Sequence, residues 1–201
     1  MKKIILLLLL LFPLASFSQQ ERWTTLNITG KLDGKWSVVM EGEQRYSHEK
    51  GYVRYFHYDA GIVRVMNKNL KLGAFYRELY QISRGIRVIE TRPHVDAFVI
   101  HGKHWKWRIR AEYQVKEIDP NIMRYRIRPT YELNRWKQWD PFIQTELNFT
   151  KYGFTRNRFN AGFTYKKGKF TIQPSFLLES INKEGIWTTT TVLWINNKIS
   201  F

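Results

Sequence analysis

Charged side chains recur at every second position in several stretches of this chain, and arginine is the commonest of them. Residues 105–116 read WKWRIRAEYQVK, so that Arg108, Arg110 and Glu112 alternate with aromatic and aliphatic side chains. Successive side chains of an extended strand point to opposite faces, so this spacing places the charges on one face of a strand. A planar guanidinium can bridge two carboxylates or hold another anion. The chemistry offered by this pattern is therefore ion pairing or anion binding.

The predicted charged face extends over several neighbouring strands. Its charged and titratable members are Glu90, Arg92, His94, Asp96, Arg108, Arg110, Glu112, Arg124, Arg126, Arg128, Glu146, Arg156 and Arg158. Pairing of strands across their turns gives two rows of facing side chains: Arg92, Glu112, Arg126, Asn148 and Arg156 in one, and His94, Arg110, Arg128, Glu146 and Arg158 in the other. A register shift of two residues stays open, because it keeps every side chain on its face.

Two interpretations of these rows follow from the cost of burying charge. An unpaired charge removed from water costs on the order of several kcal/mol, so the leading interpretation is a structural ladder of ion pairs that largely fills the interior of a barrel. Arginine outnumbers carboxylate in both rows, however. The alternative is therefore a small channel or transport protein that favours anions.

The histidines offer little support for catalysis or metal binding. A lipid hydrolase or acyltransferase needs a nucleophile beside a base. His57 and Asp59 share a face, but no serine has an evident place beside them. His94 lies among arginines, where a structural role is expected, and the pair His101 and His104 flanks a turn without acidic neighbours. We expect no catalytic residue, no metal site and no cofactor, and a lipid-modifying enzyme is the least favoured function.

Turn signals punctuate the chain at intervals of about 16 residues and leave strands of roughly 10 to 13 residues between them. Strands of about 9 to 11 residues suffice to cross a bilayer at a tilt, and they are about twice as long as is usual in soluble proteins. About 11 strand-like segments can be counted, although bacterial barrels normally have an even number. The pattern predicts an all-β fold, an antiparallel transmembrane β-barrel of about 10–12 strands, in a single domain over residues 19–201.

Alternation alone also fits a soluble barrel with an apolar interior. Strand length favours the membrane, and so do tryptophans and tyrosines near the predicted strand ends, as in an interfacial girdle. The chain ends at Phe201, with Ile199 on the same face. These two residues resemble the C-terminal signal by which barrels are recognised for assembly. We therefore expect the apolar face to contact lipid and the C-terminus to lie in the periplasm.

The first residues indicate export. Lys2 and Lys3 precede an apolar run over residues 4–12, and small residues follow up to Ser18. This is the pattern of a signal peptide over residues 1–18, and the run is too short for a membrane span. The sequence contains no cysteine and carries a formal net charge of +16. For an exported chain, this charge favours anionic lipopolysaccharide, phosphate-bearing solutes or an acidic partner over nucleic acid.

Three stretches are similar to an uncharacterised family, the domain of unknown function 2490. They are residues 75–81 (FYRELYQ), residues 110–114 (RAEYQ) with 124–128 (RYRIR), and Glu146 followed by residues 156–165 (RNRFNAGFTY). The resemblance covers nearly the whole chain after the signal peptide. It implies an outer-membrane barrel of the Gram-negative envelope and implies no activity. The expected partners are outer-membrane lipid, lipopolysaccharide and the barrel assembly machinery, with no nucleic acid, and the barrel is expected to be a monomer.

Overall fold

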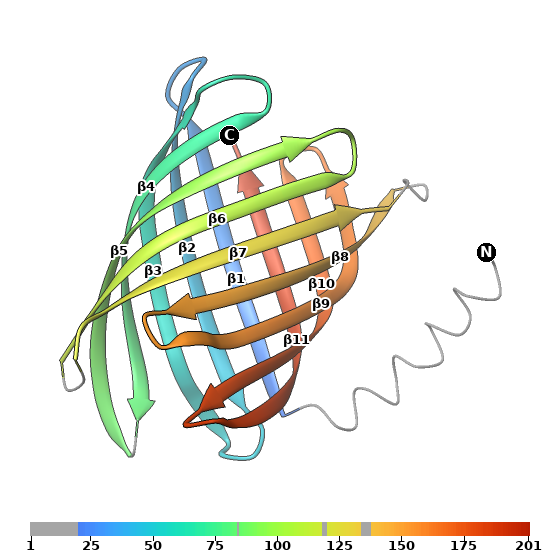
Figure 1. The fold of residues 1–201 in the computed structure, drawn as a ribbon. Coiled ribbons are helices and arrows are strands. Elements are labelled where there is room, and N and C mark those ends of the chain that lie inside the picture. The colour runs from blue at the N-terminus through green and yellow to red at the C-terminus, as the bar shows by residue number, and fades with distance from the viewer. Residues whose placement is uncertain (1–19, 84, 118–119, 134–137) are drawn as a thin grey trace.

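The computed structural model describes residues 20–83, 85–117, 120–133 and 138–201, and in them eleven strands form a closed barrel (Figure 1). The strands are β1 (Glu21–Lys31), β2 (Trp36–Ser47), β3 (Tyr52–Val65), β4 (Leu70–Ser83), β5 (Ile86–His101), β6 (Trp105–Lys116), β7 (Ile122–Glu132), β8 (Trp139–Thr150), β9 (Gly153–Lys167), β10 (Phe170–Lys183) and β11 (Ile186–Ser200). The predicted all-β barrel of 10–12 strands is thereby confirmed. The signal peptide predicted over residues 1–18 lies outside the described residues.

The barrel closes through one parallel pair, and the predicted antiparallel pairing holds at the other ten strand pairs. Every strand is antiparallel to its sequence neighbour, whereas β1 runs parallel to β11, from Glu21 opposite Val192 to Thr29 opposite Ser200. An odd number of alternating strands leaves the first and the last pointing in the same direction. A parallel seam is the geometric consequence of eleven strands.

The parallel seam places the two ends of the described chain at opposite ends of the barrel (Figure 1). Gln20 donates its backbone N–H to Thr191 at 3.1 Å, and Phe201 donates its backbone N–H to Thr29 at 2.9 Å. We call these the N-end and the C-end of the barrel. The connections after β2, β4, β6, β8 and β10 lie at the N-end, and those after β1, β3, β5, β7 and β9 lie at the C-end.

The alternation of each strand separates an apolar exterior from a polar interior. On β6, Trp107 and Ile109 are exposed while Arg110 and Glu112 are buried, as the sequence predicts. Among the described residues, 23 buried side chains are polar or charged and 9 are hydrophobic. The apolar part of the interior is small: it is centred on Trp23, Leu177 and Val192. The polarity of the interior is therefore the reverse of that in the hydrophobic core of a soluble protein.

Short connections join the strands. In the turn between β1 and β2, the carboxylate of Asp33 accepts the backbone N–H groups of Lys35 and Trp36, each at 2.7 Å. These hydrogen bonds hold the pKa of Asp33 below its usual value. Gly51 and Gly102 lie in turns with φ of 71° and 64°, a conformation that glycine adopts without strain. Within the described residues, no helix is long and apolar enough to cross a membrane.

Two glycines make room for an aromatic ring on the inner wall. A Cβ added to Gly61 would lie 2.3 Å from Phe75 Cδ1 and 2.4 Å from the carbonyl oxygen of Ala74. A Cβ on Gly73 would lie 2.5 Å from Phe75 Cε2. The ring of Phe75 in turn stacks on His94, with centroids 5.0 Å apart. The glycines of β3 and β4 thus let a buried ring lie flat against the sheet.

Candidate functional site

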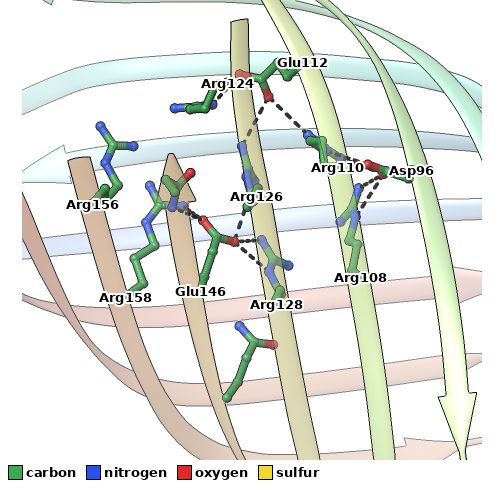
Figure 2. A network of polar contacts seen from close by, with 12 residues as sticks. Asp96, Arg108, Arg110, Glu112, Arg124, Arg126, Arg128, Glu146, Arg156 and Arg158 are labelled. Carbon is green, nitrogen blue, oxygen red and sulfur yellow. Dashed lines mark hydrogen bonds and ion pairs between the residues drawn. The ribbon is translucent and has the colours of Figure 1, made fainter. Parts of the chain in front are cut away.

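The interior of the barrel holds a network in which each central carboxylate binds several arginines (Figure 2). Glu146 on β8 accepts a hydrogen bond from Arg128 Nε at 2.6 Å and one from Arg158 Nη1 at 3.0 Å. Arg126 Nη1 lies 3.6 Å from the same carboxylate. A buried carboxylate stays charged when guanidinium groups surround it in this way.

Glu112 on β6 is the second centre of the network. It accepts hydrogen bonds from Arg124 and, at 3.2 Å, from Arg126 Nη2. The side chains of Arg92 and Arg110 complete the cluster, each 3.7 Å from one of its oxygens. Arg126 therefore contacts both Glu112 and Glu146 and joins the two centres, as Figure 2 shows.

Asp96 on β5 forms the third centre. Its carboxylate binds Arg108 at 2.6 Å and Arg110 at 2.7 Å. His94, on the same strand, lies 3.9 Å from Asp96 and donates a hydrogen bond from Nδ1 to the backbone oxygen of Arg92 at 3.0 Å. The structural role expected for His94 agrees with these contacts, since its ring is packed between Phe75 and the ion pairs.

The predicted charged face lies inside the barrel, with different degrees of burial. Its members Glu90, Arg92, His94, Asp96, Arg110, Glu112, Arg124, Arg126, Glu146 and Arg158 are buried, and Arg108, Arg128 and Arg156 are partly buried. Ile199 and Phe201 are the predicted assembly signal. Ile199 lies near the end of β11, and Phe201 follows this strand with its side chain exposed. Their positions do not bear on whether the assembly machinery recognises them, so the assembly signal stays a prediction.

The predicted register is wrong by two residues at two of the strand pairs. Asp96 lies opposite Arg110, whereas the predicted row placed His94 opposite Arg110, which would bring Arg108 beside Asp96. Glu112 lies opposite Arg124, whereas the row placed Arg126 there. Between β8 and β9 the predicted register is right, with Glu146 opposite Arg158. At each of these two pairs the centre of the hairpin lies one residue away from the predicted position, and a shift of one residue at the centre changes the facing residues by two.

Several members of the network were missed in the sequence. Arg77 binds Asp59 at 2.6 Å and Glu41 at 3.2 Å, and His57 Nε2 lies 3.1 Å from Glu41. Glu179 on β10 binds Arg158 at 2.7 Å. The same signal, charges at every second position, marks Glu41 and Glu43 in β2 and could have found them.

Two cavities lie inside the barrel and have no lining residue in common. The N-end cavity, of about 100 Å³, is lined by Arg45, Arg54, Tyr55, Arg77, Gln81, Ile82, Arg92, Arg124, Arg126, Arg156, Arg158, Glu179 and Ile181. The C-end cavity, of about 170 Å³, is lined by Lys106, Arg128, Thr130, Glu132, Phe142, Gln144, Asn160, Gln173, Ser175, Trp194, Asn196 and Lys198. Glu146 binds Arg126 of the first cavity and Arg128 of the second, so its carboxylate lies between them.

In the part of the chain that the structure describes, no group of three or more histidine, cysteine or carboxylate side chains is placed to hold a metal ion. His57 and His94 are buried in the network, while His101 and His104 lie at the turn that follows β5. The paired arginines and carboxylates of the interior are suited to ion pairing and anion binding.

Comparison with known proteins agrees with the resemblance seen in the three sequence stretches. No curated protein matches the chain. Residues 20–189 match the family described as protein of unknown function (DUF2490), and this range runs from the residue before β1 into β11. The match covers most of the chain and all but the last part of the barrel, and the chain therefore belongs to the DUF2490 family.

Proposed function

We propose that the protein is an outer-membrane barrel that serves the envelope as a structural element, with its lumen closed near the middle by ion pairs. One observation carries this proposal: the exterior is apolar while the interior is charged. Exposed large hydrophobic residues occur on every strand from β1 to β11, for example Ile62, Val95 and Ile143. In water, such an apolar surface would make the protein aggregate. In a bilayer, the same surface contacts the apolar lipid chains.

Strand length and aromatic placement support the same location. The strands are 11 to 16 residues long, which is enough to cross the hydrocarbon layer at a tilt. Toward the C-end, Trp105 packs against Tyr131, with ring centroids 5.0 Å apart. Toward the N-end, Phe154 packs against Trp187 at 5.3 Å. Aromatic clusters near both ends of the strands are typical of a girdle at the two membrane interfaces.

The ion-pair network supports a closed lumen. Arg126 spans from Glu112 to Glu146, and Arg158 spans from Glu146 to Glu179. These bridges link neighbouring strands from β6 to β10 and form a continuous band of ion pairs along the inner wall. The N-end and C-end cavities are small, about 100 and 170 Å³, and have no lining residue in common, so these two cavities do not form one continuous passage.

A small anion channel is the second candidate, and the excess of arginine in the N-end cavity favours it. That cavity is lined by eight arginines and one carboxylate. A ring of cations at a pore mouth selects anions. The two candidates differ in one property, the passage of ions through the middle of the barrel.

The location is tested by expressing the full chain, including residues 1–19, in a Gram-negative host and separating the membranes on a density gradient. We expect the protein in the outer-membrane fraction, resistant to extraction with alkaline carbonate, and with a gel mobility that changes on heating, as a folded barrel has. Recovery in the soluble periplasmic fraction would contradict the proposal.

A further inference from the structure

The arginines of the N-end cavity are not all occupied by the carboxylates of the network. Arg156 on β9 makes no hydrogen bond to another described residue, and its nearest carboxylate oxygen, Glu179 Oε1, lies 3.6 Å away. That oxygen already accepts hydrogen bonds from Arg158. In Figure 2 no dashed line reaches the guanidinium of Arg156. Arg156 therefore has N–H donors to offer to a ligand.

Two further arginines of this cavity have an unused donor. Arg124 is buried, with one terminal nitrogen on Glu112, and its Nε has no hydrogen-bond partner in the described part of the chain. Arg54 binds Glu21 through a terminal nitrogen, and its Nε is likewise buried without a partner. A buried donor without a partner costs about 1–3 kcal/mol, so a ligand or water that accepts from it is favoured. All three side chains line the same cavity.

The cavity also reaches solvent. The side chains of Arg54 and Arg156 remain 35% and 26% exposed, although both line it. The space of about 100 Å³ holds several waters, since one water takes about 30 Å³ in the liquid. It is large enough for a small anion.

We propose that the N-end cavity binds a phosphate group, held by Arg54, Arg124 and Arg156. The three side chains come from three different strands, β3, β7 and β9, and all line this one cavity. A phosphate presents three or four oxygens in a tetrahedron and can accept from all three, whereas a carboxylate has two oxygens in one plane. Arginine is also the side chain best suited to paired hydrogen bonds with phosphate. The phosphate is that of a free phosphate ion or of a phosphorylated headgroup.

This site goes beyond the proposed function, because it requires neither a particular membrane nor a closed lumen. It is tested in detergent solution by isothermal titration of the refolded full-length barrel with sodium phosphate, at constant ionic strength set with chloride. We expect saturable binding of one phosphate per chain. An absence of saturation up to 10 mM phosphate, as an order-of-magnitude limit for a functional site, would overturn the proposal.

Matched variants locate the site. A charged hydrogen bond contributes about 1.5–3 kcal/mol, so Arg156→Gln is expected to weaken phosphate binding by about 10- to 100-fold. Lys106→Gln removes the same charge from the C-end cavity, where the lysine is 45% exposed, and is expected to change the affinity less than about twofold. Equal binding by Arg156→Gln and the wild type, or an equal loss in Lys106→Gln, would contradict the assignment.

Folding of each variant is checked by its heat-dependent gel mobility. If Arg156→Gln does not fold, Arg54→Gln provides the same comparison from the rim of the cavity, with the same loss expected and with unchanged affinity contradicting the proposal. A second titration with dihexanoyl phosphatidic acid, a soluble lipid below its micelle concentration, distinguishes the two sources. Tighter binding than inorganic phosphate assigns the site to a headgroup, and weaker binding assigns it to a free phosphate. Saturation by neither overturns the proposal.

Discussion

Glu146 on β8 and Arg158 on β9 lie directly opposite each other inside the barrel, and their side chains are joined by a hydrogen bond of 3.0 Å. Both side chains are buried, and Glu146 also contacts Arg126 and Arg128. The carboxylate is thus the common counter-ion of three arginines from two neighbouring strands.

Neutralising this carboxylate is expected to destabilise the barrel. Glu146→Gln leaves three arginines without their shared partner, and breaking a buried ion pair costs about 3–5 kcal/mol. The measurement is the urea-dependent unfolding of the refolded protein in detergent micelles. The matched control is Glu132→Gln, which removes the pairing of Glu132 with the 45%-exposed Lys106 and should cost less than about 1 kcal/mol. Equal losses in the two variants would contradict the role assigned to the network.

The parallel seam between β1 and β11 predicts that the two ends of the chain face opposite sides of the membrane. The natural sequence contains no cysteine, so single cysteines report position without background. Gln20→Cys lies at the N-end, and Lys68→Cys lies in the turn between β3 and β4 at the C-end. With the C-terminus in the periplasm, a membrane-impermeant maleimide added to whole cells should label Gln20→Cys and not Lys68→Cys. Labelling of both from one side would contradict the eleven-strand closure.

The close approach of Gly61 to its neighbours predicts a local packing defect. Gly61→Ala would place a methyl group 2.4 Å from the carbonyl oxygen of Ala74, so the backbone of β3 and β4 must shift. Overpacking of this kind costs about 1–3 kcal/mol, again measured by unfolding in micelles. Gly30→Ala is the control, since nothing lies within 4 Å of its Cβ position. A loss in Gly30→Ala as large as that in Gly61→Ala would contradict this explanation.

The predicted assembly signal can be examined at the last residue. Phe201 is 63% exposed, so its side chain contributes little to the packing of the folded barrel. Phe201→Ala is therefore expected to lower the amount of barrel inserted in the outer membrane of cells severalfold, while barrels refolded in detergent unfold at the same urea concentration as the wild type. The control is Tyr152→Ala in the turn after β8, where the side chain is 75% exposed. Normal insertion of Phe201→Ala would refute the signal.

The sequence was sufficient to predict the faces of the strands, because alternation is a local property. Trp107 and Ile109 point outward and Arg110 points inward, as the period of two requires. The direction of the closing pair was not predictable in this way. The pairing of Glu21 with Val192 is a contact between the two ends of the chain, and it depends on the total number of strands.

The register of the charged rows was only partly predictable, for a related reason. Arg108 meets Asp96 as the rows predicted, although the residue opposite Asp96 is Arg110. A long arginine side chain reaches partners one step away along the neighbouring strand, so similar ion pairs form in either register. Contacts across the lumen, such as Arg158 over the ring of Trp23 at 4.9 Å, join strands that are not neighbours and follow from no sequence pattern.

Chloride flux through the protein in liposomes tests most directly whether the ion pairs close the lumen. The purified barrel is inserted into liposomes that contain a chloride-sensitive dye, insertion is verified by flotation, and a general porin serves as the open control. We predict that the wild type passes chloride no faster than empty liposomes, while the double variant Arg126→Ala with Glu146→Ala, which removes the bridge between the two cavities, passes it measurably faster. Flux through the inserted wild type at the rate of the porin would contradict a closed barrel.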